Sequence, residues 1–221
     1  GLRSMALQAM AHRLLGHKRP TDYADFLQQR LEINYYAAAC LMPLTPSIAF
    51  LSNAKRDRNL AVEDFRDAFG VTHEAAAMRM TNLLTEHVDI PLHFLRVGEN
   101  GALQRVYEND NLPLPVDVTG SVEGQIVCRR WSARAAFSEQ NRTTEHYQYT
   151  DTPAGTFWCS TQTGSVTDGE FSISVGVPFD HAKWFRGRHT QSRAVSTCPD
   201  ESCCRRPSSD RRRPSSDRTT R

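Results

Sequence analysis

Cysteine is the residue type whose spacing in this 221-residue chain could hold an inorganic centre. Three of the six cysteines stand close together near the carboxy terminus, as Cys198, Cys203 and Cys204. The residues between these cysteines are proline and polar residues, and such a short loop allows several thiolates to converge on one zinc ion or iron–sulfur cluster. Cys128 could supply a fourth ligand from a distant part of the sequence. The spacing therefore predicts a metal centre held by these four cysteines. The alternative is that the tail thiols bind nothing.

A second chemical pattern involves histidines near the amino terminus. A zinc peptidase of the HExxH type needs two histidines four residues apart on one helical face, with a glutamate beside the first as general base. If His12 is the second histidine, Gln8 and Ala9 stand at the positions of the first histidine and the base. Pairing His12 with His17 predicts rings that diverge. Glu32 could be a third ligand, but both alignments lack the base, so we expect no hydrolysis.

Apolar residues recur at helical spacing as far as Leu83, and capping residues mark the ends of the helices. Asp22 and Thr72 precede two of the apolar runs, Pro43 ends one, and Gly70 follows another. The expected helices cover residues 2–17, 21–42, 45–53, 59–68 and 72–83. The first part of the chain is therefore expected to be helical.

After Pro91 the apolar period shortens to that of a strand, and Glu99-Asn100-Gly101 is a hairpin signal before a return strand that ends near Tyr107. Further strands are expected over residues 122–127, 144–150, 155–163 and 170–177, and short helices over 132–138 and 180–185. Two prolines in residues 109–115 mark a boundary. We therefore expect a helical part with its hairpin at 1–108 and an α+β part at 109–204.

Charge is distributed unevenly along the chain, whose formal net charge is +2. Residues 205–221 hold seven arginines against Asp210 and Asp217, so this tail carries +5 and the preceding residues carry −3. By charge alone the body is not a nucleic-acid-binding surface. The duplicated Arg-Pro-Ser-Ser-Asp tail lacks apolar residues and is expected to be disordered. We also expect a cytoplasmic protein with sequence upstream of Gly1. The two remaining cysteines, Cys40 and Cys159, are expected in the core, and the alternative for Cys159 is a spare ligand.

Two segments of the helical part resemble the zinc-peptidase-like module of the ImmA/IrrE type. They are Met10-Ala-His-Arg-Leu-Leu-Gly-His17 and the run Arg30–Pro43, which ends in Ala-Ala-Ala-Cys-Leu-Met-Pro. Phe69-Gly-Val-Thr72 with the helix after it resembles a later part of that module. The resemblance implies a helical zincin-like fold, here degenerate because the histidine and glutamate of the motif are missing.

The order of further segments resembles the actinobacterial short-chain fatty acyl-CoA regulators over nearly the whole chain up to Arg206. These segments are the Pro91–Val97 strand, Cys128-Arg-Arg-Trp131 and the carboxy-terminal cysteines. The resemblance implies a regulator, not an enzyme, that binds CoA or short-chain acyl-CoA and a [4Fe-4S] cluster. It also implies a homo-oligomer, with a tetramer as one form, and a helix-turn-helix domain upstream that contacts DNA. The family often shows Cys-x2-Cys-x4-Cys where this chain has Cys-x4-Cys-Cys.

The expected fold class is therefore α+β, with a helical zincin-like (ImmA/IrrE-type) module followed by an antiparallel-sheet α/β sensor domain. CoA presents phosphates and a pantetheine arm, so its site needs cationic groups beside an apolar groove. One candidate group is Arg129 with Arg130. A second group surrounds Trp184-Phe185 and contains Lys183, Arg186 and Arg188. The alternative for each of these cations is that it is an ordinary solvated charge on the surface and binds no ligand.

Two other functions compete with the regulator interpretation. One is a divergent zinc peptidase that uses His12 and Glu32. The other is a DNA-binding module formed by helix–Gly70–helix over residues 60–84, whose second helix offers only Arg79 as a basic reader of bases and begins with acidic Glu74. Zinc analysis with a peptide-cleavage assay would distinguish the peptidase from the regulator. A salt-dependent gel shift would distinguish the DNA-binding module from it.

Overall fold

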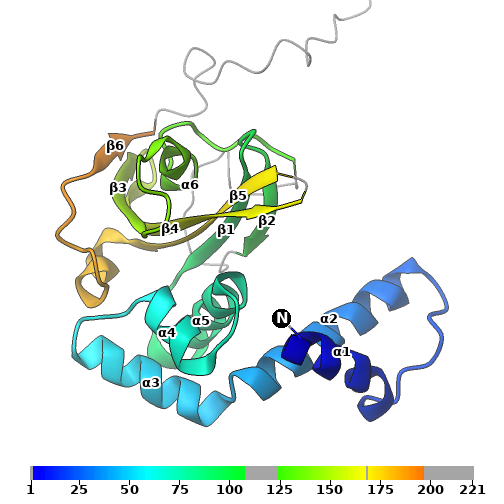
Figure 1. Ribbon diagram of the computed structural model, residues 1–221. Helices are drawn as coiled ribbons and strands as arrows, with labels where there is room; N and C mark the ends of the chain where they lie inside the picture. The colour runs from blue at the N-terminus through cyan, green and yellow to red at the C-terminus, as the bar shows by residue number, and fades with distance from the viewer. Residues whose placement is uncertain (1, 108–123, 168, 197–221) are drawn as a thin grey trace, which may run out of the picture.

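The computed structural model of the protein describes residues 2–107, 124–167 and 169–196 (Figure 1). Within these ranges the helices are α1 (Leu2–Leu14), α2 (Tyr23–Leu41), α3 (Leu44–Arg56), α4 (Val62–Phe69) and α5 (His73–Val88). The strands are β1 (His93–Gly98), β2 (Leu103–Tyr107), β3 (His146–Thr152), β4 (Gly155–Val166), β5 (Gly169–Pro178) and β6 (Arg193–Val195). Short helical segments α6 (Ser132–Ala135), η1 (Ala136–Ser138) and η2 (Phe179–Trp184) connect strands. The segment 109–115, Cys198, Cys203, Cys204 and the tail 205–221 lie outside the described residues.

The helix ends follow the capping residues that the sequence predicts. The Asp22 side chain accepts a hydrogen bond from the Asp25 amide at the start of α2, and Thr72 does the same for the Ala75 amide at the start of α5. Gly70 ends α4 with a left-handed φ of 60°, a conformation that glycine adopts without a Cβ clash. The first helix ends earlier than expected, at Leu14, because Gly16 turns the chain with a φ of 69°.

One six-stranded sheet, in the order β2-β1-β5-β4-β3-β6, joins the two halves of the chain. The α+β fold class is confirmed, but the sheet is mixed instead of antiparallel, because β6 pairs parallel with β3. The β1–β2 hairpin is hydrogen-bonded to β5, from Phe94 opposite Val175 to Gly98 opposite Phe171. The sheet therefore crosses the expected boundary between residues 108 and 109.

Each face of the sheet has its own hydrophobic core, because successive residues of a strand point to opposite faces. On one face Phe94, Trp158 and Val175 pack with the buried residues of α3, α4, α5 and η2. On the other face Leu95, Phe157 and Cys159 pack with residues 127–133, which include Cys128 and Trp131. Figure 1 shows α4 and α5 on one side of the sheet and α6 on the other. We call these the helix face and the α6 face.

The α1–α2 hairpin extends away from this body (Figure 1). The amino-terminal half of α2 packs on α1 through Gln29 and Ile33, and its carboxy-terminal end reaches the core through Ala38 and Leu41. Within the described ranges no single helix has the length and apolarity to cross a membrane. The α2 and α3 helices pass that test only as a pair, which is bent by 65°.

The short helix expected over 180–185 is present as the 3-10 helix η2. Two other expectations about smaller elements need correction. The described residues of the expected strand 122–127 form only an isolated bridge between Ile126 and Ala102. Cys40, expected in the core, is exposed on α2, whereas Cys159 is buried as expected. The spacing on α2 is compatible with a buried or an exposed Cys40, and only the packing of α2 on α1 and on the core decides between them.

Candidate functional site

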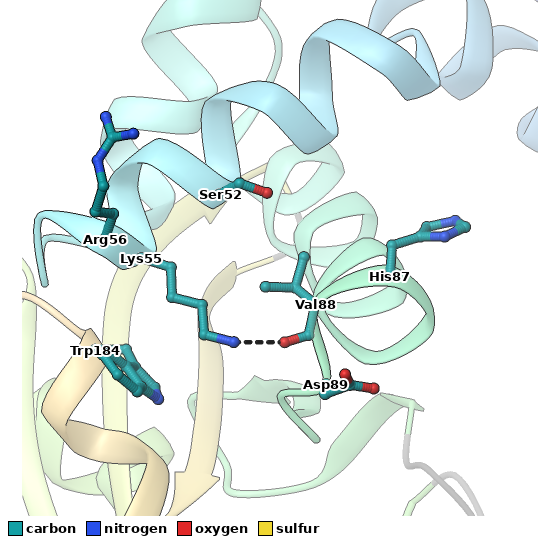
Figure 2. A pocket seen from close by; sticks show the side chains of 7 residues that line it. All are labelled: Ser52, Lys55, Arg56, His87, Val88, Asp89 and Trp184. Atoms are coloured by element: carbon teal, nitrogen blue, oxygen red, sulfur yellow. Dashed lines mark hydrogen bonds between the residues drawn. The ribbon is translucent and has the colours of Figure 1, made fainter.

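A pocket of about 410 Å³ lies where α3, the end of α5 and the end of η2 meet. It is lined by Ser52, Lys55, Arg56, His87, Val88, Asp89 and Trp184. In Figure 2 Lys55 reaches across from α3, and its Nζ donates a hydrogen bond of 2.7 Å to the carbonyl oxygen of Val88. The volume lies within the roughly 300–1,000 Å³ that small-molecule sites in proteins occupy. We call it the Trp184 pocket.

Three cations surround the indole ring of Trp184. Lys183 Nζ lies 5.1 Å from the ring centre, Lys55 Nζ 5.6 Å and the Arg58 guanidinium 5.9 Å. Asp89 is the one carboxylate among the lining residues. Cations over an aromatic face combine positive charge with an apolar surface, so the pocket offers a planar surface for a ring beside charges for an anion.

Backbone hydrogen bonds fix the position of Trp184 against the α3–α4 loop. The Leu60 amide donates to the Trp184 carbonyl at 3.0 Å, and the Arg186 amide donates to the Leu60 carbonyl at 2.9 Å. Trp184 packs against the core of the helix face, in which Trp158 and Phe185 are buried. The pocket is therefore held by two segments that lie far apart in the sequence.

The backbone beside the pocket is strained at two positions. Among the described residues, Arg58 and Asp89 are the non-glycine residues with positive φ, at 52° and 54°. Arg58 ends α3 in the manner of a Schellman motif, since the Asn59 amide bonds to the Ala54 carbonyl and the Arg58 amide to that of Lys55. Glycine is the favoured residue at such a position, and an L-residue there costs about 1 kcal/mol or more. Arginine at this position therefore points to a role for its side chain.

The cations that the sequence grouped around Trp184 have different roles in the structure. Arg186 lies in a cluster of acceptors, with Nη1 2.9 Å from Asp64 and 3.2 Å from Glu63, and its Nε donates to Asn59. The hydrogen bond to Asp64 is the first reason why the pKa of Arg186 is raised above its usual value. Arg186 thus anchors the loop to α4. Only Lys183 of this group is exposed.

Arg188 also shapes the loop, because its Nη1 donates to the carbonyls of Arg58 at 2.7 Å and Phe185 at 3.2 Å. The other predicted pair lies elsewhere. Arg129 and Arg130 are exposed beyond the α6 face, where the Gln148 side chain bonds to the Arg130 carbonyl. The two candidate groups of the sequence analysis therefore lie on opposite faces of the sheet.

Cys128 is fully buried in the core of the α6 face. Cys159 lies in the same core, with its Sγ 4.0 Å from Nε2 of the buried His93, and burial lowers the pKa of that imidazole to about 3. Within the described ranges no three histidine, cysteine or acidic side chains are arranged to hold a metal ion. Three of the four predicted thiolate ligands lie outside those ranges.

The two histidine rings near the amino terminus lie closer together than the sequence predicts. The rings of His12 and His17 have centres 5.4 Å apart, and His17 Nε2 lies 2.7 Å from Glu32 Oε2. The expectation that the rings diverge is wrong, because α1 ends at Leu14 and the turn at Gly16 brings His17 back beside His12. Ala9 still occupies the position of the general base.

Sequence reasoning missed most of the Trp184 pocket and a buried polar cluster between α4, α5 and the sheet. Glu145, before β3, lies 3.5 Å from His73 Nε2 and accepts a hydrogen bond from Ser160. Burial and the nearby Glu63 raise the pKa of Glu145 to about 7. Isolated charged residues at helix ends, such as Lys55 and Arg58, give no spacing signal, because their partner Trp184 is distant in the sequence.

Comparison with known proteins yields a fold relationship. No family model matches the chain, and no curated protein matches it. A solved structure described as a Mycobacterium tuberculosis transcriptional regulator has a similar fold, with a TM-score of 0.67 and 18% sequence identity. The match covers 96% of this chain and 68% of that chain. At this identity the two proteins share a fold, and a function must be argued from the site.

Proposed function

We propose that this chain is the effector-sensing part of a bacterial transcription regulator of short-chain acyl-CoA metabolism and is not an enzyme. The observation that carries the proposal is the shared fold with a transcriptional regulator over 96% of this chain. In this proposal the protein is cytoplasmic and forms a homo-oligomer, and a helix-turn-helix domain upstream contacts DNA. The helical part is a zincin-like scaffold and the sheet with its surrounding loops is the sensor.

The Trp184 pocket is the proposed effector site, with CoA or a short-chain acyl-CoA as the ligand. The phosphates of CoA need cations, which Lys55, Arg58 and Lys183 supply around the indole ring. The adenine ring is planar and would stack on the exposed part of Trp184. Arg186 and Arg188 support this site indirectly, because their hydrogen bonds fix the loop that carries Trp184.

The left-handed Arg58 provides a test that separates binding from folding. Arg58→Gly relieves the strained φ, so the free energy of unfolding is expected to rise by about 1 kcal/mol. The same change removes a cation 5.9 Å from the Trp184 ring and is expected to weaken propionyl-CoA binding roughly tenfold, because each such charge contributes about 1.4 kcal/mol. Calorimetric titration and urea unfolding measure the two effects on the same preparation.

Matched variants complete this experiment. Lys183→Ala removes an exposed cation 5.1 Å from the Trp184 ring and should weaken binding in the same way. Lys18→Ala removes an exposed cation from the distant α1–α2 loop and should leave binding unchanged. Equal affinities for the wild type, Arg58→Gly and Lys183→Ala would show that the Trp184 pocket is not the effector site. Arg129→Ala with Arg130→Ala then tests the other cationic pair.

A [4Fe-4S] cluster held by Cys128, Cys198, Cys203 and Cys204 is the second part of the proposal. Its support is the contact between Arg130 Nη1 and the Val195 carbonyl, at 3.3 Å. This contact places the chain three residues before Cys198 beside the segment that carries Cys128. Four thiolates suit such a cluster, and when bound it would make the sensor responsive to oxygen or redox state.

Anaerobic purification followed by iron and sulfide analysis tests the cluster. Cys128→Ser and Cys198→Ser are expected to lose iron, whereas Cys40→Ser, which alters an exposed thiol on α2, should retain it. Colourless, iron-free wild-type protein would exclude the cluster. The CoA site would still be tested independently by the propionyl-CoA titration.

One observation favours a second candidate function, a divergent zinc peptidase. His12 is in ring contact with His17, and His17 is paired with Glu32, although these three side chains are not arranged to hold a metal ion. Hydrolysis also needs a general base beside the metal, and Ala9 and Arg13 stand at the positions next to the candidate ligands. We therefore infer that this segment is a retained scaffold. Zinc stoichiometry with a peptide-cleavage assay distinguishes the two functions.

A further inference from the structure

The α1–α2 hairpin carries most of the exposed apolar surface of the described residues. Ten of the fourteen exposed large hydrophobic side chains lie between Leu2 and Tyr35. The body of the protein, by contrast, buries its large side chains on the two faces of the sheet. Apolar side chains gathered in one projecting element usually mark a surface that binds another protein.

Four of these side chains form a continuous row along α2. Tyr23, Leu27, Leu31 and Tyr35 follow each other at intervals of four residues, with exposures of 73%, 48%, 66% and 61%. Residues four apart on a helix lie on one face. The buried residues Gln29, Ile33 and Ala37 lie on the opposite face of α2. Of the row itself, Tyr35 also contacts the body, because the Arg79 guanidinium of α5 lies 5.7 Å from its ring centre. We call the exposed row the α2 stripe.

We propose that the α2 stripe is a two-fold interface between two copies of this chain. Its order, Tyr-Leu-Leu-Tyr, is the same in both directions. When two such stripes cross in opposite directions about a two-fold axis between Leu27 and Leu31, each leucine meets a leucine and each tyrosine a tyrosine. A closed dimer requires self-complementarity of this kind, and a different partner protein would not.

The geometry of the hairpin allows this contact. A row at intervals of four residues forms a ridge, and two such ridges interdigitate, each in the groove beside the other, at a crossing angle of about 50°. The hairpin extends away from the sheet and its covering helices (Figure 1), and it is the Tyr35 end of the stripe that lies beside the body, at Arg79 of α5. The assembly would leave the Trp184 pocket open, since that pocket lies between α3, α5 and η2.

The available area predicts a weak dimer. A fully exposed tyrosine side chain offers about 200 Å² and a leucine about 100 Å², so the stripe supplies roughly 400 Å² from each copy. The total of about 800 Å² lies below the roughly 1,200 Å² of stable interfaces. Met10 and Leu14, exposed on α1, can add area at the edge of the contact. The dimer should therefore form and dissociate over the micromolar range of concentration.

Sedimentation velocity of the full chain over a roughly hundredfold range of micromolar concentrations tests the interface. The wild type is expected to shift from monomer to dimer, and Leu31→Glu to remain monomeric with an unchanged circular dichroism spectrum. Val166→Glu, which changes an exposed apolar residue at the end of β4, should dimerise as the wild type does. A mixture of Leu31→Glu and Leu27→Lys copies should dimerise again, because the two-fold brings position 31 of one copy to position 27 of the other.

Two results would overturn the proposal. If the wild type remains monomeric throughout, the stripe binds something other than a second copy. If Leu31→Glu dimerises as strongly as the wild type, the interface lies elsewhere. The proposal adds a surface to the proposed regulator, and propionyl-CoA titration of the monomeric Leu31→Glu variant tests the effector site separately. A monomer that still binds CoA would leave the proposed function intact.

Discussion

Glu145 is the carboxyl group most affected by the fold. Its side chain is 7% exposed, and burial together with the charge of Glu63 raises its pKa to about 7. His73 cannot compensate, because burial lowers the pKa of its imidazole to about 4 and leaves it neutral at pH 7. Glu145 therefore keeps its proton up to about neutral pH, because its carboxylate form would be buried beside the charge of Glu63.

Glu145→Gln is expected to change how stability depends on pH. The folded protein holds the Glu145 proton up to about pH 7, whereas the unfolded chain releases it near 4.5, so the wild type loses stability as the pH rises through this interval. A shift of this size corresponds to about 3 kcal/mol. Glutamine has no proton to lose. Urea unfolding should therefore show that the variant gains stability relative to the wild type between about pH 5 and about pH 8.

The histidines act in the opposite direction, because their lowered pKa values favour the folded state as the pH rises towards 6.5. Both proteins contain them, so the comparison cancels their effect. Glu99→Gln, at an exposed hairpin position, is the matched control and should follow the wild type. If Glu145→Gln and the wild type show the same pH dependence, the pKa of Glu145 is not raised and its carboxyl group is not buried in the folded protein.

At the scale of elements, equivalent caps have different consequences. Asp22 caps α2, whose first half packs on α1 in the projecting hairpin, while Thr72 caps α5, which contributes Ala76, Met80 and Leu84 to the main core. Each cap satisfies an amide that the helix leaves without a partner. The cost of losing a cap is therefore similar locally, but only α5 transmits it to the whole fold.

Thr72→Ala is expected to lower the global free energy of unfolding by about 1 kcal/mol. Asp22→Ala should leave the unfolding midpoint nearly unchanged and instead speed amide hydrogen exchange in the first turns of α2, because the hairpin can open by itself. Urea titration and hydrogen exchange measured by mass spectrometry give the two readouts. Equal loss of global stability in both variants would mean that the hairpin and the body unfold as one unit.

At the scale of the whole molecule, the sheet makes the helical part and the later strands interdependent. β1 lies between β2 and β5, and Phe94 packs with Val175 in the core of the helix face. A fragment of residues 1–107 would expose the edge of β1 and half of this core. We expect the fragment to lack fixed tertiary structure, with few dispersed signals in its NMR spectrum. A well-dispersed spectrum would instead establish residues 1–107 as an independent domain.

The sequence by itself determined the local elements. Asp22, Thr72 and Gly70 placed helix ends, and the alternation after Pro91 placed the β1–β2 hairpin, because capping and side-chain periodicity act within a few residues. The candidate cations were also visible in the sequence, as two separate groups. The sequence did not show that the sheet lies between Arg129 and Arg186, or that Arg186 is paired with Asp64.

Only the tertiary structure decided which distant side chains meet. Strand order brought the hairpin beside β5, and packing of the α3–α4 loop against η2 placed Lys55 and Arg58 at Trp184. Packing also turned the Tyr23–Tyr35 row outward and buried Glu145. These outcomes depend on which surfaces exclude water together, and that free energy belongs to pairs of segments far apart in the chain, so no short stretch of sequence encodes it.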